Sequence, residues 1–222
     1  MHRIIGCLLF SALLGDAGRP DRGRITGRVL SRDGNPVANV KVAARVTGPG
    51  MRVLSDPWAM TDDDGRFAIY QLLLGTYQMY TEKKSDDYPN TMARFYRESP
   101  LPTVSLTPDN LSAEINIQLG PEAGEITGII SDSTTGTPIN ADVSLWRRDN
   151  KNEIVTSPSP KYLLLIPTDI DVDMEVGTDG YAGWTYAGSH NGAALRVKSG
   201  EKIILNIKLD PLRRIRIPRR FR

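Results

Sequence analysis

The sequence predicts an all-β protein that contains two tandem β-sandwich domains, and three observations lead to this prediction. The stretch Gly23-Arg-Ile-Thr-Gly-Arg-Val29 returns 101 residues later as Gly124-Glu-Ile-Thr-Gly-Ile-Ile130. Each copy is followed by a Gly-x-Pro turn, Gly34-Asn-Pro36 or Gly136-Thr-Pro138, and then by another alternating run. No stretch of the mature chain has convincing 3.6-residue periodicity. Because repeated supersecondary units mark repeated architectures, we expect two copies of one small β module.

Length and composition fit this interpretation. A chain of 222 residues has room for one or two domains of roughly 100–200 residues each. Apolar residues make up 40% of the chain and charged residues 24%, which is ordinary for a protein with a packed core. The 20 glycines and 15 prolines indicate many turns.

The first domain is expected to contain most of its strands where apolar and polar residues alternate. Residues 61–65 predict a tight turn, residues 51–60 a connecting excursion, and residues 84–103 a long polar loop rich in Tyr and Pro. The predicted strands are residues 24–31, 39–47, 66–72, 77–83 and 111–119.

The second domain keeps the opening of the first and changes its middle. Residues 162–167 form a continuous apolar run, which predicts a strand buried on both faces or closing the core. Residues 169–176 alternate strictly, so that acidic residues would line one face of a strand and apolar residues the other. Residues 195–197 and 203–209 are expected to complete the sandwich.

The order of these motifs resembles that of carboxypeptidase regulatory-like domains. Gly23-x-Ile-Thr-Gly-x-Val29, Gly34-x-Pro36, Thr61-Asp-x-Asp-Gly-Arg-Phe67 and Leu74-Gly-Thr-Tyr77 follow one another as they do in that family. The match covers roughly residues 23–119 and departs from the family at Leu72-Leu-Leu-Gly75, where members usually carry Leu-Pro-Pro-Gly. The resemblance implies transthyretin-like (prealbumin-like, Ig-like) β-sandwiches, also grouped with carbohydrate-binding-like folds, and carbohydrate as the leading ligand class.

The N-terminal segment has the pattern of an export signal. A short basic start precedes an apolar run from Ile4 to Gly15, which is about half the ~20 residues that a membrane-spanning helix needs. The alternative is a buried first strand or helix. With the signal removed, Cys7 is lost and the mature chain has no cysteine, so we expect no disulfide or thiol chemistry. The expected organisation is residues 1–17 signal, 18–22 linker, 23–120 first sandwich, 121–211 second sandwich and 212–222 tail.

The histidine count argues against an enzyme. The family resemblance raises the question of a zinc peptidase, but a catalytic zinc site needs three protein ligands. The chain has only His2, in the predicted signal, and His190, which we interpret as a loop residue. No Gly-x-Ser-x-Gly elbow and no phosphate-binding glycine loop occurs in the sequence. We therefore predict a non-enzymatic protein without a cofactor.

Two acidic clusters are candidate metal sites. Asp62, Asp63 and Asp64 are better explained as turn residues that bond to nearby backbone groups. Asp169, Asp171 and Asp173 would lie on one strand face at a spacing of ~6.6–6.8 Å, together with Glu175. A solvated outer face is the favoured interpretation, and weak calcium binding is the alternative.

Aromatic residues supply the predicted ligand-binding positions. Trp184 and Tyr186 lie two residues apart and are expected to share a strand face, with Tyr181 nearby, so their flat surfaces could stack on a sugar. The alternative is that Trp184 packs in the core. The long loop of the first domain supplies three further predicted binding residues, Tyr88, Phe95 and Tyr96. Two arginines, Arg94 and Arg97, lie beside them. They would contact a partner or fold down as a lid on their own domain.

The C-terminal segment carries the sharpest charge feature. Residues 213–222 contain six arginines and no acidic residue, and the rest of the chain has a net charge of −4. The segment could touch anionic surfaces, or be a soluble terminus; nucleic acid is not expected in an exported protein. We therefore predict a secreted, periplasmic or cell-envelope module with no membrane-spanning segment after signal cleavage. Carbohydrate or an envelope protein is the expected partner, and a purely structural spacer or protein-interaction module is the alternative.

Overall fold

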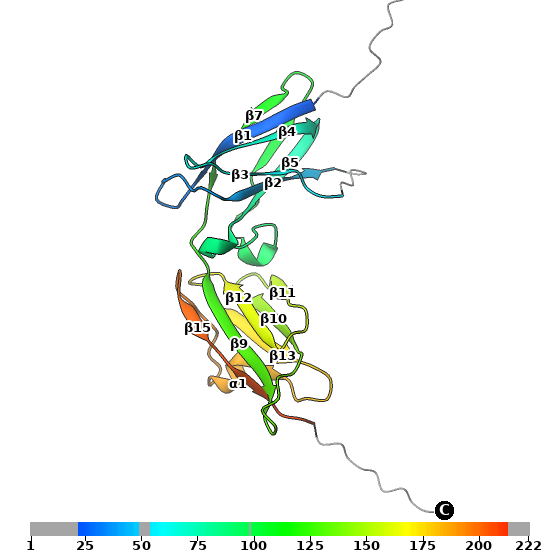
Figure 1. Ribbon diagram of the computed structural model, residues 1–222, viewed down its shortest axis with the longest axis vertical. Coiled ribbons are helices and arrows are strands. Elements are labelled where there is room, and N and C mark those ends of the chain that lie inside the picture. Colours follow the sequence, from blue (N-terminus) through cyan, green and yellow to red (C-terminus); the bar gives the residue numbers. More distant parts are fainter. Residues whose placement is uncertain (1–21, 49–53, 98, 213–222) are drawn as a thin grey trace, which may run out of the picture.

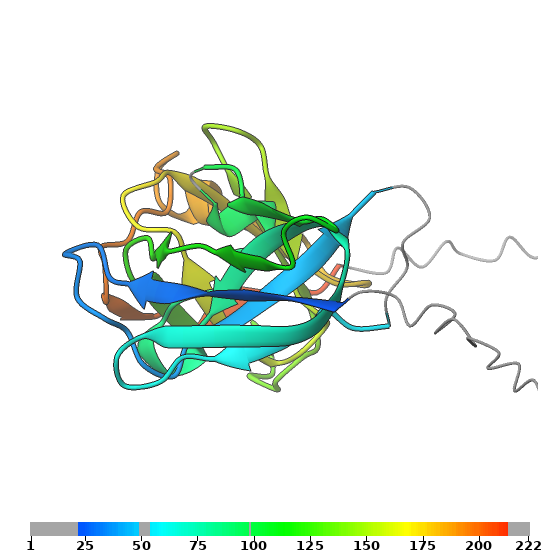
Figure 2. The same ribbon diagram turned by 90° about the horizontal axis from the view of Figure 1, so that it is seen from above.

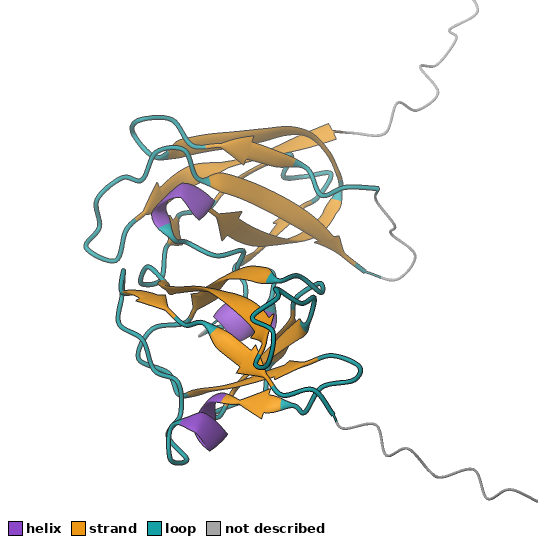
Figure 3. Cartoon of the chain, turned by 60° about the horizontal axis from the view of Figure 1, so that its bottom comes forward, coloured by secondary structure: helices purple, strands orange, loops and turns teal. Residues whose placement is uncertain are grey.

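The structure is a computed structural model that describes residues 22–48, 54–97 and 99–212. The predicted signal with Cys7, and the arginine-rich segment 213–222, lie outside the described residues. The chain folds into two β-sandwiches that follow one another along the long axis of the molecule (Figure 1). Almost all regular structure is strand, with three short helical turns (Figure 3). The predicted all-β tandem sandwich is therefore confirmed.

The first module, residues 22–119, consists of two facing sheets. One sheet has the order β4-β1-β7, with β8 also paired to β1, and the other has the order β3-β2-β5-β6. Figure 2, viewed along the long axis, shows β1 in blue with β4 on one side and green strands on the other. The strands are β1 (Arg22–Leu30), β2 (Lys41–Thr47), β3 (Trp58–Met60), β4 (Arg66–Leu73), β5 (Gly75–Glu82), β6 (Thr103–Leu106), β7 (Ser112–Glu114) and β8 (Ile117–Gln118).

The second module, residues 124–212, repeats this topology strand for strand. Its sheets have the orders β12-β9-β15, with β16 also paired to β9, and β11-β10-β13-β14. The central strand pairs antiparallel with one neighbour and parallel with the closing strands in both modules. The strands are β9 (Gly124–Asp132), β10 (Asp142–Arg147), β11 (Glu153–Val155), β12 (Lys161–Ile166), β13 (Val172–Gly177), β14 (Trp184–Thr185), β15 (Lys202–Ile204) and β16 (Ile207–Leu209).

Alternation along the strands forms each core. In β1, Ile25 and Val29 are fully buried, and in β9 the equivalent Ile126 and Ile130 are fully buried. Successive side chains of a strand point to opposite faces, so each central strand sends every second side chain between the two sheets. The repeated Ile-Thr-Gly motif thus supplies the same part of both cores.

The glycine of the motif is required by a close approach of the closing strand. β7 and β8 share one register along β1, but between them the chain bends toward β1. A Cβ atom at Gly27 would lie 1.7 Å from the carbonyl oxygen of Ile115, and one at Gly128 would lie 2.0 Å from that of Leu205. Any larger residue would have to displace the closing strand.

At this bend an asparagine side chain takes the place of a backbone hydrogen-bond acceptor. The amide N–H of Arg28 donates to Oδ1 of Asn116 at 3.1 Å, and the N–H of Ile129 donates to Oδ1 of Asn206 at 3.0 Å. Each side chain replaces the backbone acceptor that the bend has removed, which satisfies a donor that would otherwise be unpaired. The chain therefore carries a second repeated signal, Asn-Ile-x-Leu, at residues 116–119 and 206–209.

Three local expectations were wrong. The excursion at residues 51–60 ends in β3, an edge strand paired with β2. The apolar run 162–167 is not buried on both faces: β12 is an edge strand, and Leu163 is 62% exposed. The acidic alternation 169–176 becomes strand only at Val172, because Asp169 adopts a positive φ of 58° in a turn.

Within the described residues, no helix has the length and apolarity needed to cross a membrane.

Substitution of the buried motif glycines should destabilise each module separately. Gly27→Ala and Gly128→Ala should each lower the free energy of unfolding by about 1–3 kcal/mol or more, because the added methyl group meets a backbone oxygen. Gly183→Ala is the control, since nothing lies within 4 Å of its added Cβ. Urea unfolding measures the effect. Equal stabilities of all three variants would contradict the close-approach argument.

Candidate functional site at the junction of the two modules

The loop between β5 and β6 leaves the first module and packs against the second (Figure 1). It contains two 3₁₀ turns, η1 (Lys84–Asp86) and η2 (Arg94–Tyr96). Local polar contacts hold its path: the N–H of Met92 donates to Oδ1 of Asn90 at 2.8 Å, and Thr91 bonds through its Oγ1 to the backbone of Thr81. We call residues 83–102 the junction loop.

Phe95 completes the core of the second module. Its side chain is fully buried and belongs to the same apolar cluster as Ile126, Leu145 and Ile166. Tyr96 packs on this cluster and meets Phe95 edge to face, with ring centroids 5.1 Å apart. Phe95 was predicted to bind a ligand or to cover its own module. The structure instead places it inside the other module, where a ligand in solution does not reach it.

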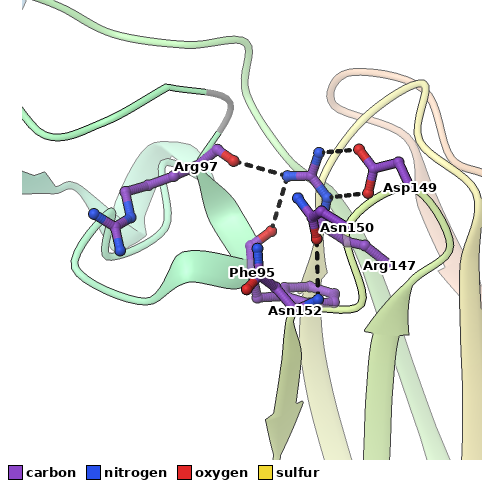
Figure 4. A network of polar contacts seen from close by, with 6 residues as sticks. All are labelled: Phe95, Arg97, Arg147, Asp149, Asn150 and Asn152. Carbon is purple, nitrogen blue, oxygen red and sulfur yellow. Dashed lines mark hydrogen bonds and ion pairs between the residues drawn. The ribbon is translucent and has the colours of Figure 1, made fainter.

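Arg147 of the second module binds the junction loop through hydrogen bonds (Figure 4). This last residue of β10 has a side chain only 4% exposed. One Nη atom donates to the carbonyl oxygens of Phe95 and Arg97, at 3.3 and 2.9 Å. Nε and the other Nη form a bidentate ion pair with Asp149, at 2.9 and 2.6 Å. The guanidinium also holds the pKa of Asp149 below its usual range.

A second set of contacts lies near the linker between the modules. The N–H of Ala123 donates to the carbonyl oxygen of Asp87 at 2.9 Å. Lys202 of the second module reaches carboxylates of Asp87 and Glu125, at 3.6 and 3.4 Å. These two carboxylates, Asp87 first, raise the pKa of Lys202. The lysine is largely exposed, so these ion pairs add orientation more than stability.

A partly open cavity of about 470 Å³ lies beneath the junction loop. Residues of β5, the junction loop, the linker and the second module contribute to its wall, and both Tyr88 and Tyr96 line it. Burial raises the pKa of Tyr96 to about 12. Burial also raises the pKa of Tyr88, with a further contribution from nearby carboxylates, of which Glu122 comes first. Both phenols therefore stay protonated at neutral pH.

The structure brings Tyr181, Trp184 and Tyr186 together only in part. All three are half-buried and pack against the second core. β14 ends at Thr185, whose side chain caps the short helix α1 (Tyr186–Ser189), so Trp184 and Tyr186 do not share a strand face. Their rings meet at 80° with centroids 6.4 Å apart, which offers no flat surface to a sugar.

Tyr181 has a structural partner. Its hydroxyl donates to Oδ2 of Asp132 at 2.9 Å, and the same carboxylate accepts the N–H groups of Thr134 and Thr135 at 2.7 and 2.8 Å. These bonds, the Thr135 backbone bond first, hold the pKa of Asp132 below its normal value of 3.8. Asp132 thus organises the turn that follows β9.

The acidic residues weighed as metal ligands are dispersed. Asp169 lies in a turn, Asp171 pairs with Arg196 at 3.3 Å, and Asp173 pairs with Arg148 at 2.6 Å. Among the residues that the structure describes, no group of three or more His, Cys, Asp or Glu side chains is placed to hold a metal ion.

His190 is engaged by its own helix. Its Nδ1 lies 3.0 Å from the carbonyl oxygen of Tyr186 and 2.8 Å from the hydroxyl of Ser189, and its ring stacks on Tyr186. A carbonyl accepts only, so this contact assigns the proton to Nδ1. Nδ1 is then unable to take a proton from Ser189, and the pair does not act as base and nucleophile.

Sequence reasoning missed an aromatic face on the first module. Trp58 is 56% exposed, and the backbone register places it and Tyr80 on either side of Ala43. Nζ of Lys41 lies 5.5 Å from the Trp58 ring, and the Arg45 guanidinium lies 6.0 Å from the Tyr80 ring. The available signal was the alternation of Trp58 and Met60 in a segment interpreted as irregular. We call Lys41, Arg45, Trp58, Met60 and Tyr80 the aromatic face.

Polar contacts fix the aromatic face in place. Asp56 accepts the hydroxyl of Tyr80 at 2.9 Å and forms an ion pair with Arg45 at 3.0 Å. Burial and this carboxylate raise the pKa of Tyr80 to about 12.

Comparison with solved structures finds two pilins and one further bacterial protein at low similarity. The Bacillus anthracis TIE protein matches over 86% of this chain and 34% of its own, with 13% identity and a TM-score of 0.33. A streptococcal ancillary pilin matches over 87% and 63%, with 13% identity and a TM-score of 0.36. A minor pilin of Streptococcus agalactiae matches over 89% and 100%, with 14% identity and a TM-score of 0.35.

These values do not assign the chain to a family. This chain spans only about a third of the Bacillus anthracis protein and under two thirds of the streptococcal pilin. No protein-family model and no curated protein sequence matches it.

Truncation of Phe95 should destabilise the second module although the residue belongs to the first. Phe95→Ala should cost about 3–5 kcal/mol of unfolding free energy, because it leaves a cavity in a closed core. Tyr70→Ala, at a position 60% exposed, is the control. Urea unfolding followed by tryptophan fluorescence in a Trp58→Phe background, where only Trp146 and Trp184 of the second module remain, measures the change. A loss confined to the first module would contradict the placement of Phe95.

Stability of the second module should fall at acid pH through Asp132. Because its folded-state pKa is lowered, the carboxylate stabilises the fold above its unfolded value of about 3.8, and the contribution disappears as pH falls through the folded value. Asp132→Asn should flatten the dependence of melting temperature on pH below about pH 4. The exposed Asp169→Asn is the control. Equal slopes in wild type and Asp132→Asn would refute this role.

Proposed function

We propose that this chain is a non-catalytic structural and protein-interaction unit that holds two β-sandwiches in a fixed relation and presents the aromatic face to a partner. The observation that carries the proposal is the junction: Phe95 of one module is buried in the other, and Arg147 binds the loop that delivers it. A flexible tandem array would have no use for such a contact.

The energetics favour a rigid junction. Separation of the modules would expose Phe95, which costs about 1.5–3 kcal/mol for the side chain alone. It would also remove two carbonyl acceptors from a guanidinium that is almost completely buried. Any opening too small to admit water would leave those donors unpaired on a buried charge, which is costly. Together these terms disfavour hinge motion.

The aromatic face has the composition of an interaction surface. Trp, Tyr, Met and Arg are enriched in protein interfaces, and a few such residues usually supply most of the binding energy. Trp58 and Met60 are 56% and 47% exposed on an edge strand. A large exposed indole lowers the solubility of the free protein. A partner that covers the indole would explain why Trp58 is exposed.

Export and family membership form part of this proposal. Residues 1–17 have the composition of a signal peptide, which would place the unit outside the cytoplasm, at the cell envelope or beyond it. The motif order at residues 23–77 supports a relationship to carboxypeptidase regulatory-like domains, in two copies.

Carbohydrate binding is the second candidate, and Trp58 is the observation that favours it. The indole is exposed on a sheet face, with the cations of Lys41 and Arg45 close by to bond hydroxyl groups. The pair Trp184 and Tyr186, by contrast, is half-buried and not coplanar. Any sugar site is therefore proposed on the first module and not on the second.

Small-angle X-ray scattering tests the rigid-unit proposal. Residues 18–222 should scatter as one elongated shape. Arg147→Lys should broaden the distribution of distances between the two modules, because lysine keeps the charge but lacks the planar fork that binds the junction loop. Arg148→Lys, at the neighbouring exposed position, is the control. A broad ensemble in the wild-type protein would end the proposal, and so would turnover of a substrate by the purified chain.

A glycan panel separates the two candidate functions. Binding that is lost in Trp58→Ala and kept in Trp184→Ala would support carbohydrate as the ligand. No glycan binding, together with a defined protein crosslinked through a photoreactive residue at position 58, would support the interaction unit.

A further inference from the structure

Eight of the 21 residues that line the cavity beneath the junction loop are tyrosines or prolines. Prolines lack an N–H and fix their own backbone, so such a wall is preformed and rigid. Tyrosine adds flat surfaces with a polar tip. A volume of about 470 Å³ lies within the range of ligand sites, which often occur between domains. The tyrosines and prolines that line the cavity are Tyr80, Tyr88, Pro89, Tyr96, Pro100, Pro102, Pro121 and Pro167.

Tyr88 and Tyr96, two of the three tyrosines that line this cavity, stand in different electrostatic surroundings. Glu122 lies in the linker between Pro121 and Ala123, which both line the cavity, and Asp33 follows Arg32, which also lines it. Glu122 and Asp33 both act on Tyr88, and neither forms an ion pair with another described residue. Arg32 is the cation beside them. The Tyr88 end therefore carries carboxylates that can take a further cation.

The Tyr96 end is a donor end. Burial alone raises the pKa of Tyr96, without a contribution from a neighbouring charge. Its hydroxyl has no hydrogen-bond partner among the described residues, and Arg97 lines the cavity beside it. In Figure 4 the side chain of Arg97 points away from Arg147. Tyr96 and Arg97 can therefore donate to acceptors on a ligand.

We propose that the junction cavity binds an extended, proline-rich peptide segment of a partner protein, with a basic residue of that segment at the Tyr88 end. A polyproline II segment has no internal hydrogen bonds, so its carbonyl groups are free to accept from donors such as Tyr96 and Arg97. Its pyrrolidine rings pack on aromatic side chains, which is how aromatic-lined grooves recognise such segments. The carboxylates of Glu122 and Asp33 complement the basic residue.

This inference deepens the proposed interaction function and rests on it. A peptide in the cavity would touch the junction loop, the linker and the second module at once, because all three contribute to the wall. Binding should therefore stabilise the closed junction by mass action.

Fluorescence anisotropy with labelled peptides tests the proposal on residues 18–222. The probes are a decaproline, the same peptide preceded by one arginine, and a glycine–serine peptide of equal length. The arginine-bearing peptide should bind most tightly and the glycine–serine peptide should not bind. Tyr88→Leu should weaken binding about ten-fold, as loss of one anchoring aromatic does. Tyr70→Leu, which changes an exposed tyrosine outside the cavity, should have no effect.

Two milder variants keep the test decisive if Tyr88→Leu does not fold. Glu122→Gln should remove the advantage of the arginine while leaving decaproline binding unchanged. Tyr88→Phe retains the ring and should leave decaproline binding intact. Absence of proline-peptide binding, equal binding of the glycine–serine peptide, or an arginine advantage that survives Glu122→Gln would each overturn the inference. Scattering of the unliganded protein distinguishes this failure from failure of the rigid-unit proposal.

Discussion

Burial of Phe95 is the interaction on which the arrangement of the two modules depends. The side chain leaves the first module on a twenty-residue loop and fills space between the sheets of the second. Arg147 stands at the end of β10 at a position where β10 otherwise sends apolar residues inward, and its guanidinium satisfies the carbonyl groups of the loop. The two residues act together. The Phe95 side chain completes the core of the second module, and the Arg147 guanidinium donates to the carbonyl groups of Phe95 and Arg97, which would otherwise be buried without a partner.

Duplication accounts for the rest of the architecture. The two modules share strand order, strand direction and a glycine under the bend of the closing strand, with an asparagine that replaces the lost ladder acceptor. Two connections differ, and one of them is the loop that joins the fifth strand to the sixth in each module. In the first module it is the junction loop, whereas in the second, between Gly177 and Trp184, it is a short turn. The other is the connection after the sixth strand, which is a short turn between Leu106 and Ser112 in the first module and a longer segment with α1 between Thr185 and Lys202 in the second.

Local pattern was sufficient to predict the fold because sandwich strands alternate, and alternation is visible in a few residues. It failed where distant contacts decide. Phe95 joins a core whose other buried residues run from Ile126 to Leu209, and nothing in its own loop indicates which module it enters. Leu163 lies in an apolar run, yet its strand is at a sheet edge and exposes one face. Trp184 and Tyr186 have the spacing of a shared strand face. Thr185, which lies between them, ends the strand and caps the helix that begins at Tyr186.

The same reasoning explains why the aromatic residues divide into two roles. Aromatics near the junction and in the second module are buried or half-buried, and each has a structural partner: Phe95 a core, Tyr181 a carboxylate, Tyr186 a stacked histidine. Trp58 is held on the surface instead, with a cation against one side of its ring and a neighbouring tyrosine fixed by Asp56. Trp58 and Tyr70 are the strongly exposed aromatics among the described residues, and Trp58 leaves its indole in water on an open sheet edge, a free-energy cost that an external contact would remove. In the function proposed above, a rigid junction fixes where that contact lies relative to the second module.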